Sequence, residues 1–169
     1  SASNTRDFKR VDLVPEVLTK LNKNIKWVHF GSGPMDDAVI ENIEGLPSNV
    51  KAEFKGFVPN LEVLDFLKTQ NVDLFLSLSK SEGLPISMME AIAHGIPIFA
   101  GNVCGIPDLI NEETGAMFEL DDSMDEIAKK LSLQLDKKLN RENIVTFARN
   151  RFDFNSNYAK FYTELPYEK

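Results

Sequence analysis

Cysteine is almost absent from this chain: Cys104 is the single cysteine among 169 residues. One cysteine cannot form a disulfide within the chain, and no other metal-ligand residues surround it at a metal-binding spacing. We therefore expect Cys104 to be a buried or loop thiol. We expect neither a metal site nor a bound cofactor.

Long apolar runs are also lacking. No stretch approaches the roughly 20 consecutive apolar residues that are needed to cross a bilayer. The first residues, beginning at Ser1, do not have the pattern of a secretory signal. These two absences predict a cytoplasmic protein.

Positive charge is in deficit. The chain has 19 lysine and arginine residues against 26 aspartate and glutamate residues, which gives a formal net charge of −7. Domains that bind nucleic acid usually carry a basic face, so nucleic acid is not an expected partner. An anionic ligand would not be attracted from a distance either, so local groups would have to hold it.

Short apolar runs alternate with amphipathic stretches along residues 1–169, a length that suits a single domain. We expect strands at 1–4, 26–30, 51–55, 74–78, 98–101 and 116–119, and helices at 9–21, 35–43, 61–68, 85–94, 106–111, 123–137, 141–150 and 155–165. Such alternation predicts an α/β fold, a Rossmann-like doubly wound parallel sheet of about six strands with helices on both faces.

The most informative segment is 79–97, SKSEGLPISMMEAIAHGIP. The apolar run before it, DLFLSLS, is typical of a strand that is buried on both faces. Pro85 suits the start of a helix, and Gly95 with Pro97 suits its end. This strand, turn and helix place free N–H groups at the carboxyl edge of a parallel sheet, where an anion can bind.

Two acidic residues, Glu82 and Glu90, stand eight positions apart in this segment. Because carboxylates repel phosphate, we expect both to accept hydrogen bonds from neutral hydroxyls, as in a ligand whose sugars flank a diphosphate. The alternative is that Glu82 is a solvated loop charge and Glu90 an exposed helix residue. Spacing alone does not decide between the two interpretations.

The segment EGLPISMMEAIAHGIP, residues 82–97, resembles the Glu-x7-Glu segment of retaining glycosyltransferases of family four. The resemblance covers nearly the whole chain, in the order of the C-terminal, donor-binding half of a GT-B enzyme. It includes the loop with Lys9, WVHFGSGP at 27–34, VKAEFKGFVPN at 50–60, CGIPDLI at 104–110, TGAMF at 114–118 and a closing helix at 152–162.

The resemblance implies roles for the charged residues of the segment. Glu82 would bond hydroxyls of the donor sugar, and Glu90 would bond those of the ribose. Lys9 would hold the diphosphate and stabilise its charge as the sugar leaves, so Glu82 and Lys9 are the catalytic candidates. In many relatives an arginine assists this lysine, but the matching position here is Asn4, so Arg6 or Arg10 would have to replace it.

The remaining binding groups implied by the resemblance belong largely to the main chain. The N–H groups of Gly83, Leu84 and Ile86 would hold phosphate. The loop with Phe57 and Val58 would contact the nucleobase by packing and main-chain atoms. The alternative is that Phe57 packs in the core and does not contact a ligand.

From the resemblance we expect a nucleotide-sugar-binding domain that transfers a sugar, with retention at the anomeric carbon, to a glycan or lipid-linked acceptor. An N-terminal acceptor domain would precede it, the full enzyme would associate peripherally with a membrane, and the isolated domain would be inactive. Two alternatives stay open: a non-catalytic module that binds nucleotides or sugar phosphates, and a GT-B nucleotide-sugar epimerase. The base, the sugar, the acceptor and the oligomeric state are not predicted.

Overall fold

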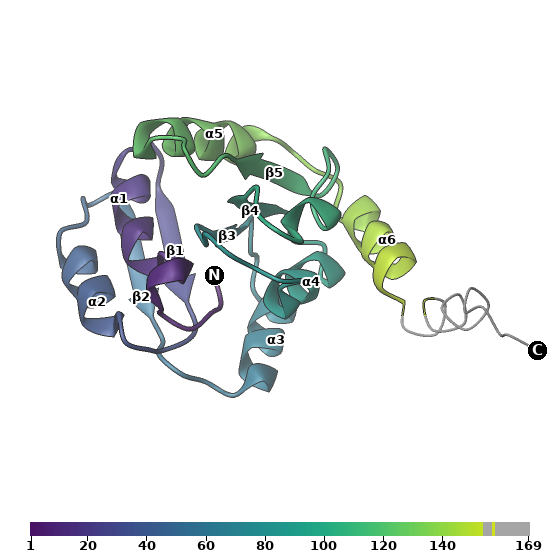
Figure 1. The fold of residues 1–169 in the computed structure, drawn as a ribbon, viewed down its shortest axis with the longest axis horizontal. Coiled ribbons are helices and arrows are strands. Elements are labelled where there is room, and N and C mark those ends of the chain that lie inside the picture. Colours follow the sequence, from purple (N-terminus) through teal and green to yellow (C-terminus); the bar gives the residue numbers. More distant parts are fainter. Residues whose placement is uncertain (154–156, 158–169) are drawn as a thin grey trace, which may run out of the picture.

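The computed structural model describes residues 1–153 and 157 (Figure 1). The helix expected at 155–165 lies outside the described residues, apart from Asn157. The strands are β1 (Ile25–His29), β2 (Val50–Phe54), β3 (Phe75–Ser77), β4 (Ile98–Gly101) and β5 (Gly115–Phe118). The α-helices are α1 (Val14–Thr19), α2 (Asp36–Glu44), α3 (Asn60–Thr69), α4 (Ile86–Ala93), α5 (Met124–Asp136) and α6 (Arg141–Phe152). Within the described residues, no helix is both long and apolar enough to pass through a bilayer.

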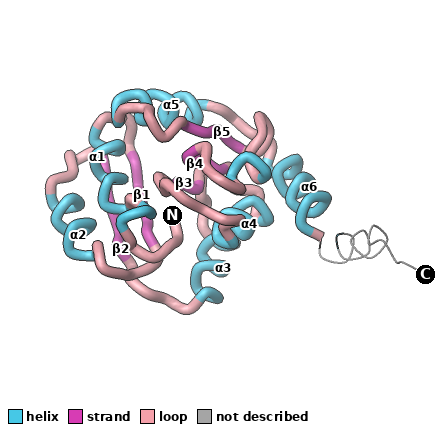
Figure 2. The backbone as a smooth tube through the Cα atoms, viewed as in Figure 1, coloured by secondary structure: helices cyan, strands magenta, loops and turns pink. Residues whose placement is uncertain are grey.

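The described strands, magenta in Figure 2, form two sheets. Every ladder between them is parallel. In one sheet β1 pairs with β2, with Ile25 opposite Val50. In the other, β4 lies between β3 and β5, and Ile98 is opposite both Phe75 and Gly115. Parallel strands require crossover connections, and helices supply most of them.

Helices cover both faces of the sheets. Successive side chains of β4 point to opposite faces of their sheet and so enter different hydrophobic cores. Phe99 packs toward the core shared with α1, α2 and α5, whereas its neighbours Ile98 and Ala100 pack toward the core shared with α3, α4 and α6. A strand that is buried on both sides has apolar residues in succession, as β3 and β4 do. The doubly wound α/β fold expected from the sequence is confirmed.

The number of strands and the first helix differ from expectation. Five strands are described instead of about six, because only Ala2 of the expected strand 1–4 forms a ladder bridge, to Phe30. The helix expected at 9–21 is broken into two 3-10 turns, Asp7–Lys9 and Val11–Leu13, followed by α1. Arg10, with a φ of 52°, separates the turns, and a left-handed residue cannot continue a helix.

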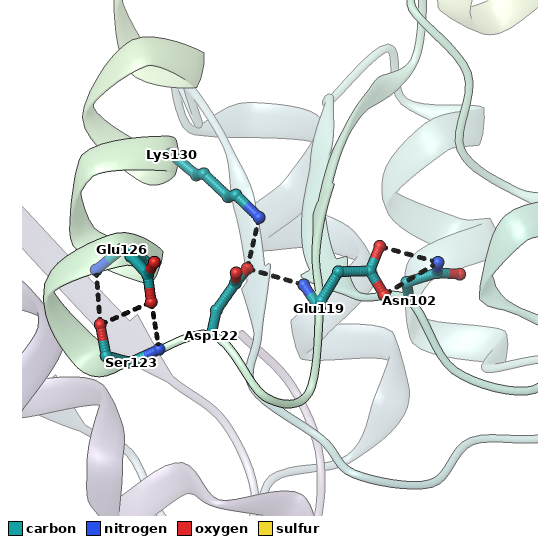
Figure 3. A network of polar contacts seen from close by, with 6 residues as sticks. All are labelled: Asn102, Glu119, Asp122, Ser123, Glu126 and Lys130. Carbon is teal, nitrogen blue, oxygen red and sulfur yellow. Dashed lines mark hydrogen bonds and ion pairs between the residues drawn. The ribbon is translucent and has the colours of Figure 1, made fainter.

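Hydrogen bonds and an ion pair connect the loops that follow β4 and β5 to each other and to α5 (Figure 3). Ser123 caps α5, and the Glu126 side chain accepts the backbone N–H of Ser123 in return. Asp122 accepts the backbone N–H of Glu119 at 2.8 Å, and the Glu119 carboxylate accepts from Asn102 Nδ2 at 3.0 and 3.2 Å. These bonds fix the path of the chain from β5 into α5.

Gly31 follows β1, at a point where the chain passes close to another segment. Its φ is +126°, and a Cβ at this position would lie 1.8 Å from the carbonyl oxygen of Ser3. Its N–H donates to the carbonyl of Gly56 at 2.8 Å. Only glycine fits here, because both the left-handed backbone and the contact exclude a side chain.

We expect Gly31→Ala to lower the free energy of unfolding by more than about 2 kcal/mol, since the added methyl group strains the backbone and displaces the Ser3 segment. Gly45→Ala is the matched control, because a Cβ there has no neighbour nearer than 3.9 Å. Urea unfolding of both variants measures the difference. Equal stabilities would contradict the close approach.

His29, the last residue of β1, is fully buried. Its Nδ1 lies 2.9 Å from Ser1 Oγ, and its ring stacks on Phe54 with centroids 5.5 Å apart. Its Nε2 has no hydrogen-bond partner in the described part of the chain. Burial, with the nearby N-terminal ammonium as a second cause, lowers the pKa of His29 from 6.5 to about 3.

This lowered pKa predicts a loss of stability in acid. Between pH 6.5 and 3 the unfolded chain binds a proton at His29 that the folded chain does not, so stability falls as pH falls. We expect about 2 kcal/mol of this loss between pH 6.5 and 5. The free energy of unfolding, measured with urea at several pH values across that range, should change less with pH for His29→Gln than for the unaltered chain. An equal change with pH in both proteins would contradict the lowered pKa of His29.

Candidate functional site

Lys9 and Glu82, which are 73 positions apart, form an ion pair in the structure. The Lys9 ammonium donates to both carboxylate oxygens of Glu82, at distances of 2.7 and 2.6 Å. The two side chains are 16% and 8% exposed. Such a pair is shielded from water on most sides, so each charge depends on the other.

Main-chain contacts hold the Lys9 loop against the segment that follows β3. The carbonyl of Phe8 accepts the backbone N–H of Lys80 at 2.8 Å and the hydroxyl of Ser79 at 3.1 Å. The left-handed Arg10 ends the turn immediately after Lys9. The fold therefore positions Lys9 through its backbone as well as through its charge.

The start of α4 lies just beyond Glu82 and has free N–H groups. Pro85 precedes the helix without a side-chain cap. In residues 1–153, no acceptor bonds the N–H groups of Gly83, Leu84 or Ile86. All three residues are exposed. An uncapped helix start with free amides is suited to an anion.

Glu90 lies on α4, one helical turn after Ile86, and is half-buried. Its carboxylate accepts from Asn60 Nδ2 at 3.0 Å, and its carbonyl lies 2.8 Å from Nδ1 of His94. Glu82 and Glu90 thus bond different partners, Lys9 and Asn60. The sequence motif did not indicate that Asn60 bonds Glu90. The one weak signal was the position of Asn60 directly after Pro59, at the start of α3.

The loop of Gly56, Phe57 and Val58 leads to the same end of α3. Gly56 has a φ of +64° and bonds Gly31 through its carbonyl. Phe57 is 84% exposed, whereas Val58 is half-buried. The alternative that Phe57 belongs to the core is therefore wrong. Its ring is exposed, where a ligand can reach it.

Asn4 stands where the family resemblance implies an arginine, and Arg6 and Arg10 are the candidates to replace that arginine. Asn4 and Arg6 are exposed, whereas Arg10 is 8% exposed and its Nε has no partner among the described residues. Thr5, between them, donates to Asp36 at the start of α2. Arg6 is accordingly the more accessible of the two arginines.

Asp36 ties the glycine turn after β1 to the Lys9 loop, and sequence reasoning missed it. It accepts the backbone N–H of Gly33 at 2.8 Å and the hydroxyls of Ser32 and Thr5. Desolvation raises the pKa of Asp36, but these hydrogen bonds together lower it below its ordinary value. An acidic residue in the first turn of a helix was the available signal.

Residues 2–151 match the model of the family described as glycosyl transferases group 1. The chain is 29% identical over 142 residues to N-acetyl-alpha-D-glucosaminyl L-malate synthase of Bacillus anthracis, which covers 82% of this chain and 36% of that protein. It is 29% identical over 163 residues to a sulfoquinovosyl transferase of Arabidopsis thaliana, covering 92% of this chain and 30% of that protein. The chain thus spans about a third of these relatives.

Solved structures share the fold. The lipopolysaccharide outer core galactosyltransferase WaaB superposes with a TM-score of 0.80 at 20% identity, over 96% of this chain and 48% of that one. The Anabaena protein HepE, in complex with UDP and glucose, superposes with a TM-score of 0.75 at 20% identity, over 96% of this chain and 47% of that one. At this identity the likeness shows the fold alone.

Removing one partner of the ion pair tests its contribution to stability. We expect Lys9→Met to lower the free energy of unfolding by about 1–3 kcal/mol, because it leaves the Glu82 carboxylate buried and unpaired. Lys80→Met is the control, since that exposed lysine lies 4.0 Å from Asp7 and should contribute less than about 0.5 kcal/mol. Adding Glu82→Gln to Lys9→Met should restore part of the loss. Equal losses of unfolding free energy for Lys9→Met and Lys80→Met, measured by urea unfolding, would contradict a stabilising role of the ion pair.

Proposed function

This chain belongs to the glycosyl transferases group 1 family, and we propose that it is the donor-binding domain of a retaining glycosyltransferase. Its donor would be a nucleotide-sugar, and its acceptor a glycan or a lipid-linked sugar. The chain spans about a third of its curated relatives, so the proposed enzyme includes an acceptor domain beyond residues 1–169. Transfer would need both domains, and this domain alone would bind the donor without transferring it.

The observation that supports the proposal best is the Lys9–Glu82 pair beside the uncapped start of α4. This position follows β3, at the carboxyl edge of a parallel sheet, where open α/β folds bind ligands. A lysine, an acid and a row of free N–H groups then lie within one short region. The combination suits a ligand that has both phosphates and hydroxyls.

The diphosphate would be held by the N–H groups of Gly83, Leu84 and Ile86 together with Lys9. An ammonium has three N–H donors, and Glu82 accepts two of them. The third can reach a phosphate oxygen without breaking the ion pair. The pair also neutralises the Glu82 charge, which would otherwise repel an anion. Arg6, exposed on the same loop, is our candidate for the missing second cation.

The hydroxyls on the two sides of the diphosphate would be bound by the two acids. Glu82 would accept from the donor sugar, and Glu90, which Asn60 already orients, would accept from the ribose. The exposed ring of Phe57, with Val58 behind it, would pack on the base. In each case a carboxylate or aromatic group meets the part of the ligand whose chemistry it matches.

The chemistry proposed for this domain is assistance to the leaving group. When the bond between the anomeric carbon and the phosphate oxygen breaks, the electron pair goes to the diphosphate and its negative charge increases. The Lys9 ammonium and the α4 N–H groups would stabilise that charge more strongly in the transition state than in the ground state.

A passive nucleotide-binding module is the second candidate, and Asn4 favours it. This exposed asparagine carries no charge at the position where the family resemblance implies an arginine. A weaker hold on the diphosphate would still permit binding but would assist departure of the leaving group less. Donor hydrolysis by a longer protein that includes an acceptor domain separates the two candidates.

Calorimetric titration of the chain with UDP, GDP and ADP tests the site. We expect one of the three to bind, and Lys9→Ala to weaken that binding by roughly 10- to 100-fold, because a charge-assisted hydrogen bond contributes roughly 1.5–3 kcal/mol. Glu90→Ala should weaken it by about tenfold through loss of the ribose contact.

Lys80→Ala is the matched control for this titration, because its side chain is exposed and lies outside the proposed contacts. Circular dichroism verifies that each variant is folded. Equal affinity of Lys9→Ala, Glu90→Ala and the unaltered chain would remove the site.

A further inference from the structure

Gly105 lies in the loop between β4 and a 3-10 turn, Ile106–Asp108, and its backbone approaches the backbone of Gly83. A Cβ at Gly105 would lie 2.5 Å from the carbonyl oxygen of Gly83 and 3.1 Å from its carbonyl carbon. Gly105 has a φ of −84° and a ψ of 0°, which most residues can adopt in a turn. Glycine is therefore required here by the close approach and not by the backbone conformation.

The loop that carries Gly105 is held in place on both sides of that residue. Asn102 donates its N–H to a carbonyl of β5 at 2.7 Å, and Ile106 donates its N–H to the carbonyl of Val103 at 2.9 Å. The side chains of Val103 and Ile106 are buried in the core shared with α3, α4 and α6. A side chain at position 105 would therefore displace the segment of Gly83 rather than its own loop.

The peptide group between Gly83 and Leu84 has no comparable support. In the part of the chain that the structure describes, neither the carbonyl of Gly83 nor the N–H of Leu84 forms a hydrogen bond. Gly83 is exposed, and a Cβ at that position would have no neighbour within 4 Å. The backbone of Gly105 therefore restricts which way this peptide group can point.

The contact with Gly105 also indicates the direction of the Leu84 N–H. No peptide bond among the described residues is cis, and in a trans peptide group the C=O and N–H bonds point in opposite directions. The oxygen of Gly83 lies 2.5 Å from the Cβ position of Gly105, whereas the nitrogen of Leu84 lies 3.6 Å from it. The carbonyl thus faces the loop after β4, and the N–H of Leu84 faces away from that loop.

We propose that Gly105 is a positioning residue of the candidate site. Because it has no side chain, the carbonyl of Gly83 can lie against the loop after β4, and the N–H of Leu84 is directed toward a phosphate of the donor. Gly105 acts on the phosphate contact proposed above, so its role rests on the proposed function. A donor group whose direction is already set needs no reorganisation when the ligand binds or reacts.

Gly105→Ala should turn this peptide group, and Gly45→Ala is the matched control, because a Cβ at Gly45 has no neighbour nearer than 3.9 Å. The residual dipolar coupling of the Leu84 N–H bond, measured by NMR, reports the direction of that bond in the free protein. We expect this coupling to change in Gly105→Ala and to stay unchanged in Gly45→Ala. An unchanged coupling in folded Gly105→Ala would overturn the proposal.

Calorimetric titration with UDP, GDP and ADP measures the effect on binding. We expect Gly105→Ala to weaken the binding of whichever nucleoside diphosphate binds by about tenfold, because a hydrogen bond to a charged group is lost. The affinity for the matching nucleoside without phosphates, measured by NMR titration, should stay unchanged. Equal losses of affinity for the diphosphate and for the nucleoside would indicate a general distortion and would overturn the proposal.

A second variant leaves the loop after β4 intact. Leu84→Pro removes the N–H of Leu84 and should weaken binding of the same nucleotide by about tenfold. Adding Gly105→Ala to Leu84→Pro should weaken binding no further, because both changes act on one N–H group. Additive losses, or a Leu84→Pro variant that binds as tightly as the unaltered chain, would overturn the proposal. Circular dichroism verifies that each variant is folded.

The two proposals fail in different measurements. If none of the three nucleotides binds the unaltered chain, the proposed function fails, and the role of Gly105 in binding fails with it. If the unaltered chain binds a nucleotide and Gly105→Ala binds it equally tightly, only the role of Gly105 fails.

Discussion

The ion pair between Lys9 and Glu82 is the interaction on which the arrangement of the candidate site depends. It joins a turn near the start of the chain to the loop between β3 and α4, and both charges are largely shielded from water. A buried charge without its partner is strongly unfavourable, so each residue restricts where the other can lie. The two bonds to the Phe8 carbonyl make the same connection through the main chain.

The ion pair also bears on how a chain with a net negative charge could hold an anionic ligand. With a net charge of −7 the protein does not attract anions from a distance. Within the candidate site, however, the carboxylate of Glu82 is balanced by Lys9, and the free N–H groups at the start of α4 carry partial positive charge. In the proposed site, local neutralisation and oriented main-chain dipoles would be the means by which an acidic surface accepts a phosphate.

Much of the fold could be predicted from the sequence, because apolar runs and helix boundaries are local signals. The strand at 98–101 has the predicted bounds, and α4 begins one residue after the predicted position, with Pro85 as its N-cap. The helix predicted at 9–21 is confirmed only from Val14 to Thr19, because Arg10 adopts a left-handed conformation, which apolar spacing does not reveal. The predicted roles of Glu82, Glu90 and Lys9 in binding and catalysis stay predictions.

The sequence by itself determined the class of fold, the free helix start after Glu82 and the family resemblance, since each depends on residues close together in the chain. Tertiary structure alone decided that Lys9 bonds Glu82, that Asn60 bonds Glu90, and that Phe57 faces solvent rather than the core. It also decided that β1 and β3 face one another across a groove. These relations join segments tens of residues apart, and they depend on how helices and strands pack in space, which local patterns do not encode.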